Sequence, residues 1–142
     1  MQLQDLKSQL TLVFPVRIDC EERRENLRVV LRQLDGLGCR MLVLEADAVP
    51  ALGDEAWPDG VEYTFVEDAS TVFHRTRYIN ELLRMAGTEV VGVWDTDVLV
   101  GYAQIGEAVQ RTRTNHILYP IHIVYQMFQY QGSLEIPFFP VT

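Results

Sequence analysis

The sequence predicts an α/β fold built around a mostly parallel central sheet. Short runs rich in β-branched residues alternate with longer stretches in which apolar residues recur at helical spacing. This alternation is typical of parallel strands joined by crossover helices. The chain has 142 residues, of which 48% are hydrophobic and 23% charged, so we expect one soluble globular domain over residues 1–142.

The first strand and the first helix carry the clearest patterns. Residues 12–16 predict a buried strand that ends at the polar residues 17–19. Residues 21–37 begin with acidic side chains, repeat apolar residues at helical spacing and end at glycines, so a helix is expected. A second buried strand is expected at 41–44, and the prolines and glycines of 50–60 predict a surface loop.

The second half of the chain repeats this pattern. Alternating apolar residues predict a third strand at 61–66, and residues 70–87 predict a helix that ends at a glycine. A fourth strand is expected at 90–94 and a shorter helix at 104–112. These elements complete the expected alternation of strands and helices.

The tail, about residues 117–142, is aromatic and interrupted by prolines, so we expect it to be irregular. Its aromatic side chains either fill the core or leave apolar surface exposed. Exposed apolar surface favours self-association, so the tail is a candidate interface for a homo-oligomer.

The charge balance excludes a general nucleic-acid binder. The chain carries 20 acidic and 12 basic residues, for a net charge of −8, whereas such binders present clustered positive charge. No stretch approaches the ~18 consecutive apolar residues that a membrane span needs. We therefore expect no nucleic-acid partner and no membrane span.

Cysteine usage and missing motifs narrow the class further. Cys20 and Cys39 have no C-x-x-C spacing, and the first residues lack the apolar core of a signal peptide. These features favour a cytoplasmic setting, with peripheral attachment to the inner face of a membrane left open. No G-x-G-x-x-G, P-loop or G-x-S-x-G motif occurs, which disfavours other nucleotide-binding α/β enzymes and serine nucleophiles.

Charged residues follow each predicted strand. In an open α/β sheet, ligands bind in the crevice outside the carboxyl ends of the strands. The residues at these ends are Arg17 and Asp19, Glu45 and Asp47, Glu67 and Asp68, and Asp95 and Asp97. We expect them to converge on one site, the alternative being that Glu45, Glu67 and Asp68 only cap the next turn.

Asp95 and Asp97 lie in the otherwise apolar run "VVGVWDTDVLV". Two carboxylates one residue apart at a strand end can share one divalent cation, whose other ligands come from phosphate oxygens. Arg75 lies near the start of the preceding predicted helix, residues 70–87. The free amide groups of a helix start and the guanidinium of Arg75 both favour phosphate. The alternative is that Arg75 belongs to a solvated first turn.

Three motifs in this order resemble a known family. They are "P-x-R" in "VFPVRIDCEERRENLRVVL", then "F-x-R-x-x-x-x-N" and "D-x-D" in "FHRTRYINELLRMAGTEVVGVWDTDV". Together they resemble the nucleotide-binding half of GT-A-fold glycosyltransferases, in particular galactosyltransferase-like and chondroitin-polymerase-like members of family 2. The resemblance covers about residues 10–125. It implies a Rossmann-like GT-A sandwich and a metal-dependent transferase that uses a UDP-sugar donor of the galactose or N-acetylhexosamine type and a saccharide acceptor.

The resemblance also implies roles for single residues. The uridine part of the donor would be held by Pro15, Val16, Arg17 and Asp19, with Asp47 or Glu45 beside the uracil or ribose. The remaining roles fall near the diphosphate: Arg75 would reach it or the donor sugar, Asn80 would brace the loop, Trp94 would back the site, Asp95 would contact ribose or a metal-bound water, and Asp97 would ligate Mn²⁺ or Mg²⁺.

Such enzymes carry their acceptor-binding half, catalytic base and a metal-binding histidine further along the chain. His116 and His122 lie too early for that ligand, and no later acidic motif offers the base. We therefore expect the acceptor half to lie outside these 142 residues, and the sequence identifies no catalytic residue. The alternative is a non-catalytic module that binds a nucleotide or a protein and retains the GT-A fold.

Overall fold

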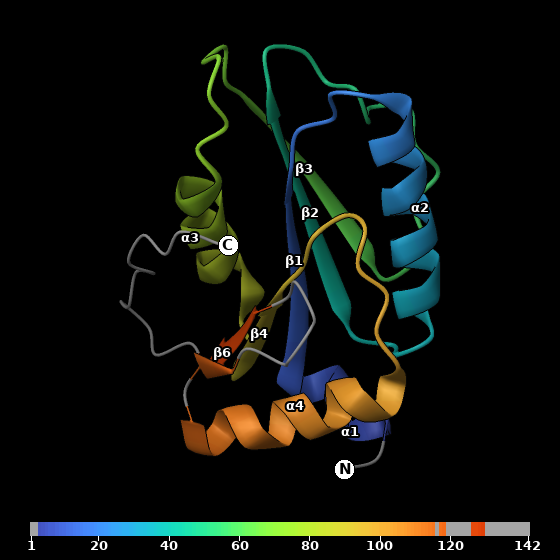
Figure 1. The fold of residues 1–142 in the computed structure, drawn as a ribbon, viewed down its shortest axis with the longest axis vertical. Coiled ribbons are helices and arrows are strands. Elements are labelled where there is room, and N and C mark those ends of the chain that lie inside the picture. The colour runs from blue at the N-terminus through green and yellow to red at the C-terminus, as the bar shows by residue number, and fades with distance from the viewer. Residues whose placement is uncertain (1–2, 116, 119–125, 130–142) are drawn as a thin grey trace.

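A six-stranded sheet confirms the predicted α/β fold. The computed structural model describes residues 3–115, 117–118 and 126–129. Strands β3, β2, β1 and β4 lie side by side and run parallel, and β6 and β5 extend the sheet antiparallel beyond β4 (Figure 1). In chain order the elements are α1 (Leu3–Gln9), β1 (Leu10–Val16), α2 (Glu21–Asp35), β2 (Arg40–Asp47), β3 (Val61–Glu67), α3 (Arg75–Ala86), β4 (Val90–Val93), α4 (Tyr102–Asn115), β5 (Ile117–Leu118) and β6 (Gln126–Gln129).

Helices cover both faces of the sheet. Along β1, Leu12 and Phe14 pack into a core shared with α2, α1 and α4, while Val13 packs into a second core with α3. Successive strand residues point to opposite faces, so a strand covered on both sides must be apolar throughout. All seven residues of β1 are buried, which explains its continuous hydrophobic run.

The strand order places a switch point between β1 and β4. From β1 the chain moves outward through β2 to β3 and then returns to the other side of β1 as β4. Open α/β sheets bind their ligands outside the carboxyl ends of the strands at such a point, here the ends of β1 and β4. The loops that leave these ends supply the residues of the candidate site.

Several boundaries differ from the sequence expectation. The helix expected from residue 70 begins at Arg75, because residues 68–74 form a turn that is held by side chains. Strand β2 continues to Asp47, since Glu45 and Asp47 pair with Phe65 and Glu67 of β3. The short helix α1 was not expected from its polar sequence, and only one of its described side chains, Leu6, is buried.

Two short strands lie within the tail that was expected to be irregular. In the register of the sheet, Val91 of β4 lies opposite Phe128 of β6, and Ile117 of β5 also pairs with Phe128. Residues 119–125 and 130–142 lie outside the described residues, and so does the predicted interface through the aromatic tail. Within the described part of the chain, none of the helices combines the length and the apolar composition that a bilayer span requires.

Candidate functional site

The D-x-D motif forms a turn directly after β4. Asp95 is half-buried, Thr96 is buried and Asp97 is exposed at the tip of the turn. Arg75, the first residue of α3, reaches across so that its Nη2 lies 2.7 Å from Oδ1 of Asp95. The structure thus joins two residues that the sequence placed in the site separately.

Trp94, the residue before the D-x-D turn, holds the turn through two hydrogen bonds. Its indole is buried at 1% exposure, and Nε1 donates a 3.0 Å hydrogen bond to the carbonyl of Val98. Its backbone N–H donates to the carbonyl of Val13 in β1, also at 3.0 Å. These two bonds flank the turn from Asp95 to Asp97, and the role of Trp94 in backing a ligand site stays a prediction.

The charges around this turn oppose one another. Burial raises the pKa of Asp95 above its ordinary value and the charge of Asp97 acts in the same direction, whereas Arg75 and Arg23 lower it. Carboxylates are the oxygen ligands that hard divalent cations prefer, and a cation would relieve this repulsion. Among the described residues no three His, Cys, Asp or Glu side chains form a group able to hold a metal ion. A cation at this pair would need its other ligands from phosphate or water.

Arg17, at the end of β1, uses its guanidinium within the protein. It donates hydrogen bonds to the carbonyls of Ala46 (2.8 Å), Ser70 (2.7 Å) and Asp68 (3.2 Å). The guanidinium carbon also lies 5.5 Å from the centre of the Phe73 ring. Arg17 consequently links β1, β2 and the segment that follows β3.

Glu45 holds the loop over residues 48–60. It is fully buried, and its carboxylate accepts hydrogen bonds from the amides of Ala51 (2.8 Å) and Leu52 (3.2 Å) and from the hydroxyl of Tyr63 (2.6 Å). Burial is the largest cause that raises the pKa of the Tyr63 phenol, and the hydrogen bond to Glu45 raises it further. Of the two acids named for the second strand, Glu45 is thus engaged in supporting a loop.

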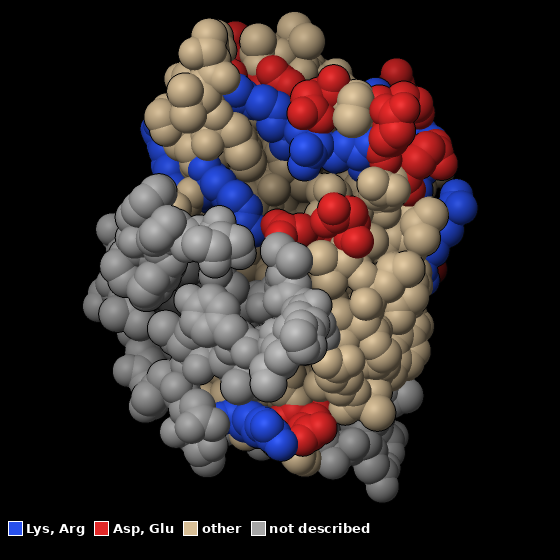
Figure 2. All heavy atoms as spheres, viewed as in Figure 1, with Lys and Arg blue, Asp and Glu red and all other residues tan. Residues whose placement is uncertain are grey.

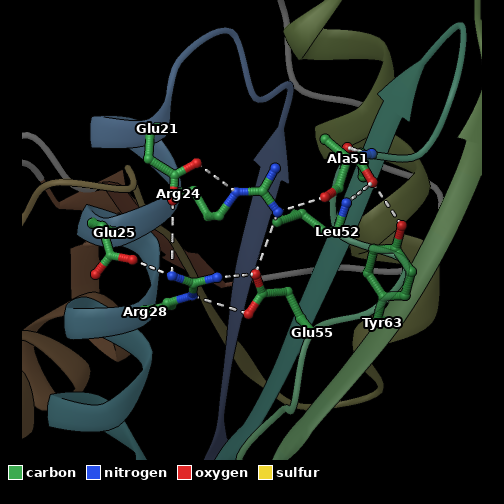
Figure 3. Close-up of polar contacts among 9 residues, drawn as sticks. Glu21, Arg24, Glu25, Arg28, Ala51, Leu52, Glu55 and Tyr63 are labelled. Atoms are coloured by element: carbon green, nitrogen blue, oxygen red, sulfur yellow. Dashed lines mark hydrogen bonds and ion pairs between the residues drawn. The ribbon is translucent and has the colours of Figure 1, made fainter.

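Helix α2 holds the same loop from the other side (Figure 3). Arg28 forms a two-pronged ion pair with Glu55 at 3.0 and 2.7 Å, and Arg24 donates to the carbonyl of Ala51 at 2.6 Å. The Glu55 side chain is 10% exposed and that of Arg28 is 35% exposed, so the pair is only partly shielded from solvent. Contacts from both α2 and β2 thus hold the loop.

The other residues expected at the uridine side differ in accessibility. Pro15 and Val16 are buried within β1, so only the backbone beyond them reaches the site. Asp19 is exposed and pairs with Arg23 of α2 at 2.8 Å. Asp47 is half-buried, and one of its oxygens accepts the amide of the next residue at 2.7 Å.

Two further acids and Asn80 complete the set. Asp68 accepts hydrogen bonds from the Ser70 amide at 2.9 Å and from the Tyr78 hydroxyl, so it caps a turn as the alternative reading proposed. Glu67 is exposed at the end of β3. Asn80 is half-buried on α3, one turn beyond Arg75.

Sequence reasoning missed Arg23, Phe73 and Tyr78 as parts of this region. Arg23 carries a recognisable signal, because it follows Asp19 at the i+4 spacing of a helical ion pair. Phe73 and Tyr78 stack with ring centres 5.8 Å apart, a contact that depends on the path of residues 68–74. Figure 2 shows basic and acidic side chains interleaved over the upper end of the molecule, where the carboxyl ends of the parallel strands lie.

Comparison with known proteins identifies the fold. No family model matches the chain, and no curated protein matches it. Among solved structures, it is similar to the crystal structure of S. aureus TarS 1-349, with a TM-score of 0.53 at 12% sequence identity. The match covers 77% of this chain and 33% of the TarS chain, so the chain spans about a third of the length of that relative.

The chain therefore has a Rossmann-like α/β fold with four parallel strands. It matches the N-terminal part of the GT-A domain of TarS, a glycosyltransferase. This likeness agrees with the fold that the motifs imply, and it shows the fold alone. The assignment to family 2 stays a prediction.

Proposed function

We propose that this domain binds a UDP-sugar together with Mn²⁺ or Mg²⁺, as the donor-binding part of a glycosyltransferase. One observation carries the proposal: in a fold like that of the TarS GT-A domain, the D-x-D turn lies at the switch point, 2.7 Å from the first arginine of α3. A guanidinium suited to phosphate and a pair of carboxylates thus lie together where α/β sheets bind ligands.

The arrangement suggests how the charges are divided. Asp97 is exposed at the tip of its turn, so we assign it as the direct ligand of the cation. Asp95, whose Oδ1 already accepts Arg75, would contact ribose or a metal-bound water. Arg75 would pair with the diphosphate or the donor sugar through charge-assisted hydrogen bonds. When bound, the cation would stabilise the departing diphosphate.

The base and ribose would lie beside the ends of β1 and β2. Asp19 and Asp47 offer accessible carboxylates there, and the backbone after Val16 lines the same edge. Glu45 would contribute through the loop that it holds. We propose a sugar of the galactose or N-acetylhexosamine type and a saccharide acceptor, which the rest of a longer enzyme or a partner would bind.

Calorimetric titration of the purified chain with UDP, with and without Mn²⁺, tests the proposal. We expect Mn²⁺ to tighten UDP binding, and Asp97→Asn to abolish that gain while leaving the fold unchanged. Asp54→Asn is the matched control, because Asp54 is an exposed loop aspartate away from the D-x-D turn. UDP binding that ignores Mn²⁺ in both proteins would favour the non-catalytic nucleotide-binding module, and no UDP binding would favour a protein-interaction module.

A further inference from the structure

The Arg17 guanidinium donates its hydrogen bonds to backbone carbonyls of two different segments. Its Nε donates to the carbonyl of Ala46 in β2, and its Nη1 and Nη2 donate to the carbonyls of Ser70 and Asp68. A guanidinium is a planar fork of five N–H donors, so one side chain can span three acceptors on two segments. Arg17 thereby fixes the 68–74 segment, defined as the residues between β3 and α3, against the centre of the sheet.

Side chains at both ends of the same segment contact one another. Phe73 lies under the Arg17 guanidinium and stacks on Tyr78, with the ring centres 5.8 Å apart. The Tyr78 hydroxyl donates to Asp68, and the other oxygen of Asp68 accepts the Ser70 amide. Because each member contacts the next, the loss of Arg17 would loosen both ends of the segment.

Helix α3 has no capping side chain of its own. Its N-cap residue, His74, makes no side-chain hydrogen bond to the first turn, whereas a capped helix start is fixed locally. The Arg75 amide instead donates to the carbonyl of Phe73 at 3.0 Å. The position of Arg75, and with it the contact to Asp95, is consequently set by the 68–74 segment.

We infer that Arg17 is a positioning residue that sets Arg75 for the nucleotide, in place of the direct uridine contact that the motif implies. This inference rests on the proposed function for its effect on UDP, but not for its effect on the segment. Lysine at this position keeps the charge, yet a single ammonium cannot reach three carbonyls and stack on Phe73 together. Arg17→Lys is therefore the informative variant.

Hydrogen exchange of the free protein, followed by mass spectrometry, tests the positioning. We expect Arg17→Lys to speed exchange of the amides in residues 68–78, with the β4 amides unchanged. Phe73→Leu, which removes the ring beneath the guanidinium, should speed the same amides and provides a second route if Arg17→Lys fails to fold. Arg77→Lys is the control, because Arg77 is exposed and its guanidinium carbon lies 5.9 Å from the centre of the Tyr78 ring, outside the 68–74 segment. Unchanged exchange in both Arg17→Lys and Phe73→Leu would overturn the inference.

A double-mutant cycle on UDP affinity tests the route through Arg75. We expect Arg17→Lys to weaken UDP binding about tenfold in the wild type but less than about twofold in the Arg75→Ala background, because coupled residues are not additive. Equal losses in both backgrounds would instead indicate direct contact of Arg17 with UDP and overturn the inference. If the wild type binds no UDP, the proposed function fails, and the exchange measurement decides alone whether Arg17 fixes the segment.

Discussion

Arg75 and Asp95 form an ion pair between the start of α3 and the loop after β4, with Nη2 and Oδ1 2.7 Å apart. Each side chain is about one-third exposed, at 31% and 28%, so the pair is partly shielded from water. Asp95 is thus compensated in the free protein by a residue that is also suited to phosphate. The partially buried carboxylate needs this partner, because burial disfavours its charged form.

Replacing Arg75 should affect both ligand binding and Asp95. We expect Arg75→Gln to weaken UDP binding by about 1.5 to 3 kcal/mol, the usual contribution of a charged hydrogen bond, or about 10- to 150-fold. The variant should also lower the free energy of unfolding, since Asp95 loses its partner. Calorimetry and urea unfolding measure the two effects, with Arg77→Gln as a control from the same helix turn. Unaltered UDP affinity in Arg75→Gln would contradict the assigned role.

Glu45 should act on stability more than on ligand affinity. Glu45→Gln puts an amide where the carboxylate accepted three hydrogen bonds, so at least one buried N–H or hydroxyl loses its acceptor. An unsatisfied buried group costs about 1 to 3 kcal/mol. We expect urea unfolding to show a loss of this size and limited proteolysis to show faster cleavage within residues 48–60. Glu67→Gln, at an exposed strand end, serves as the control and should change neither measurement.

The sequence predicted the fold class because the fold class follows from periodicity. Buried strands read as continuous apolar runs, and the charged residues after them fall at one edge of any parallel sheet. The structure brings Arg75 and Asp95 together at that edge, and the ligand-binding roles of Asp95, Asp97 and Arg75 stay predictions. The match to the TarS domain supports the same fold.

The sequence could not predict which partner each polar side chain hydrogen-bonds. Glu45 and Asp47 are two residues apart on one strand and look equivalent, yet Glu45 is fully buried against a loop and Asp47 is partly accessible. Arg17 bonds to carbonyls 29 to 53 residues away, which no local pattern encodes. The start of α3 was misplaced for the same reason, because long-range contacts hold residues 68–74 out of the helix.

Asp68 should make stability depend on pH at the acidic end. Hydrogen bonds from Tyr78 and Ser70 hold the pKa of Asp68 below its ordinary value of 3.8. Since the folded state binds this proton less readily than the unfolded state, the stabilisation is present above pH ~4 and is lost as the pH falls toward the lowered pKa. In urea unfolding, we expect Asp68→Asn to differ most from the wild type at pH 7 and progressively less below pH ~4. An Asp68→Asn difference that stays constant down to pH 3 would contradict this origin.

Trp94 should couple the buried core to the D-x-D turn. Trp94→Phe retains an aromatic ring but removes the Nε1 hydrogen bond to the Val98 carbonyl and leaves a small cavity. We expect the free energy of unfolding to fall by about 1 to 3 kcal/mol and the Mn²⁺-dependent part of UDP binding to weaken, because the turn is no longer fixed at its far end. Trp57→Phe is the matched control, because Trp57 belongs to the loop of residues 48–60 and stacks on Tyr63. The Trp57→Phe protein has Trp94 as its single tryptophan, so its fluorescence should change when UDP and Mn²⁺ are added together. If Trp94→Phe and Trp57→Phe lose the Mn²⁺ effect equally, the indole hydrogen bond does not hold the D-x-D turn.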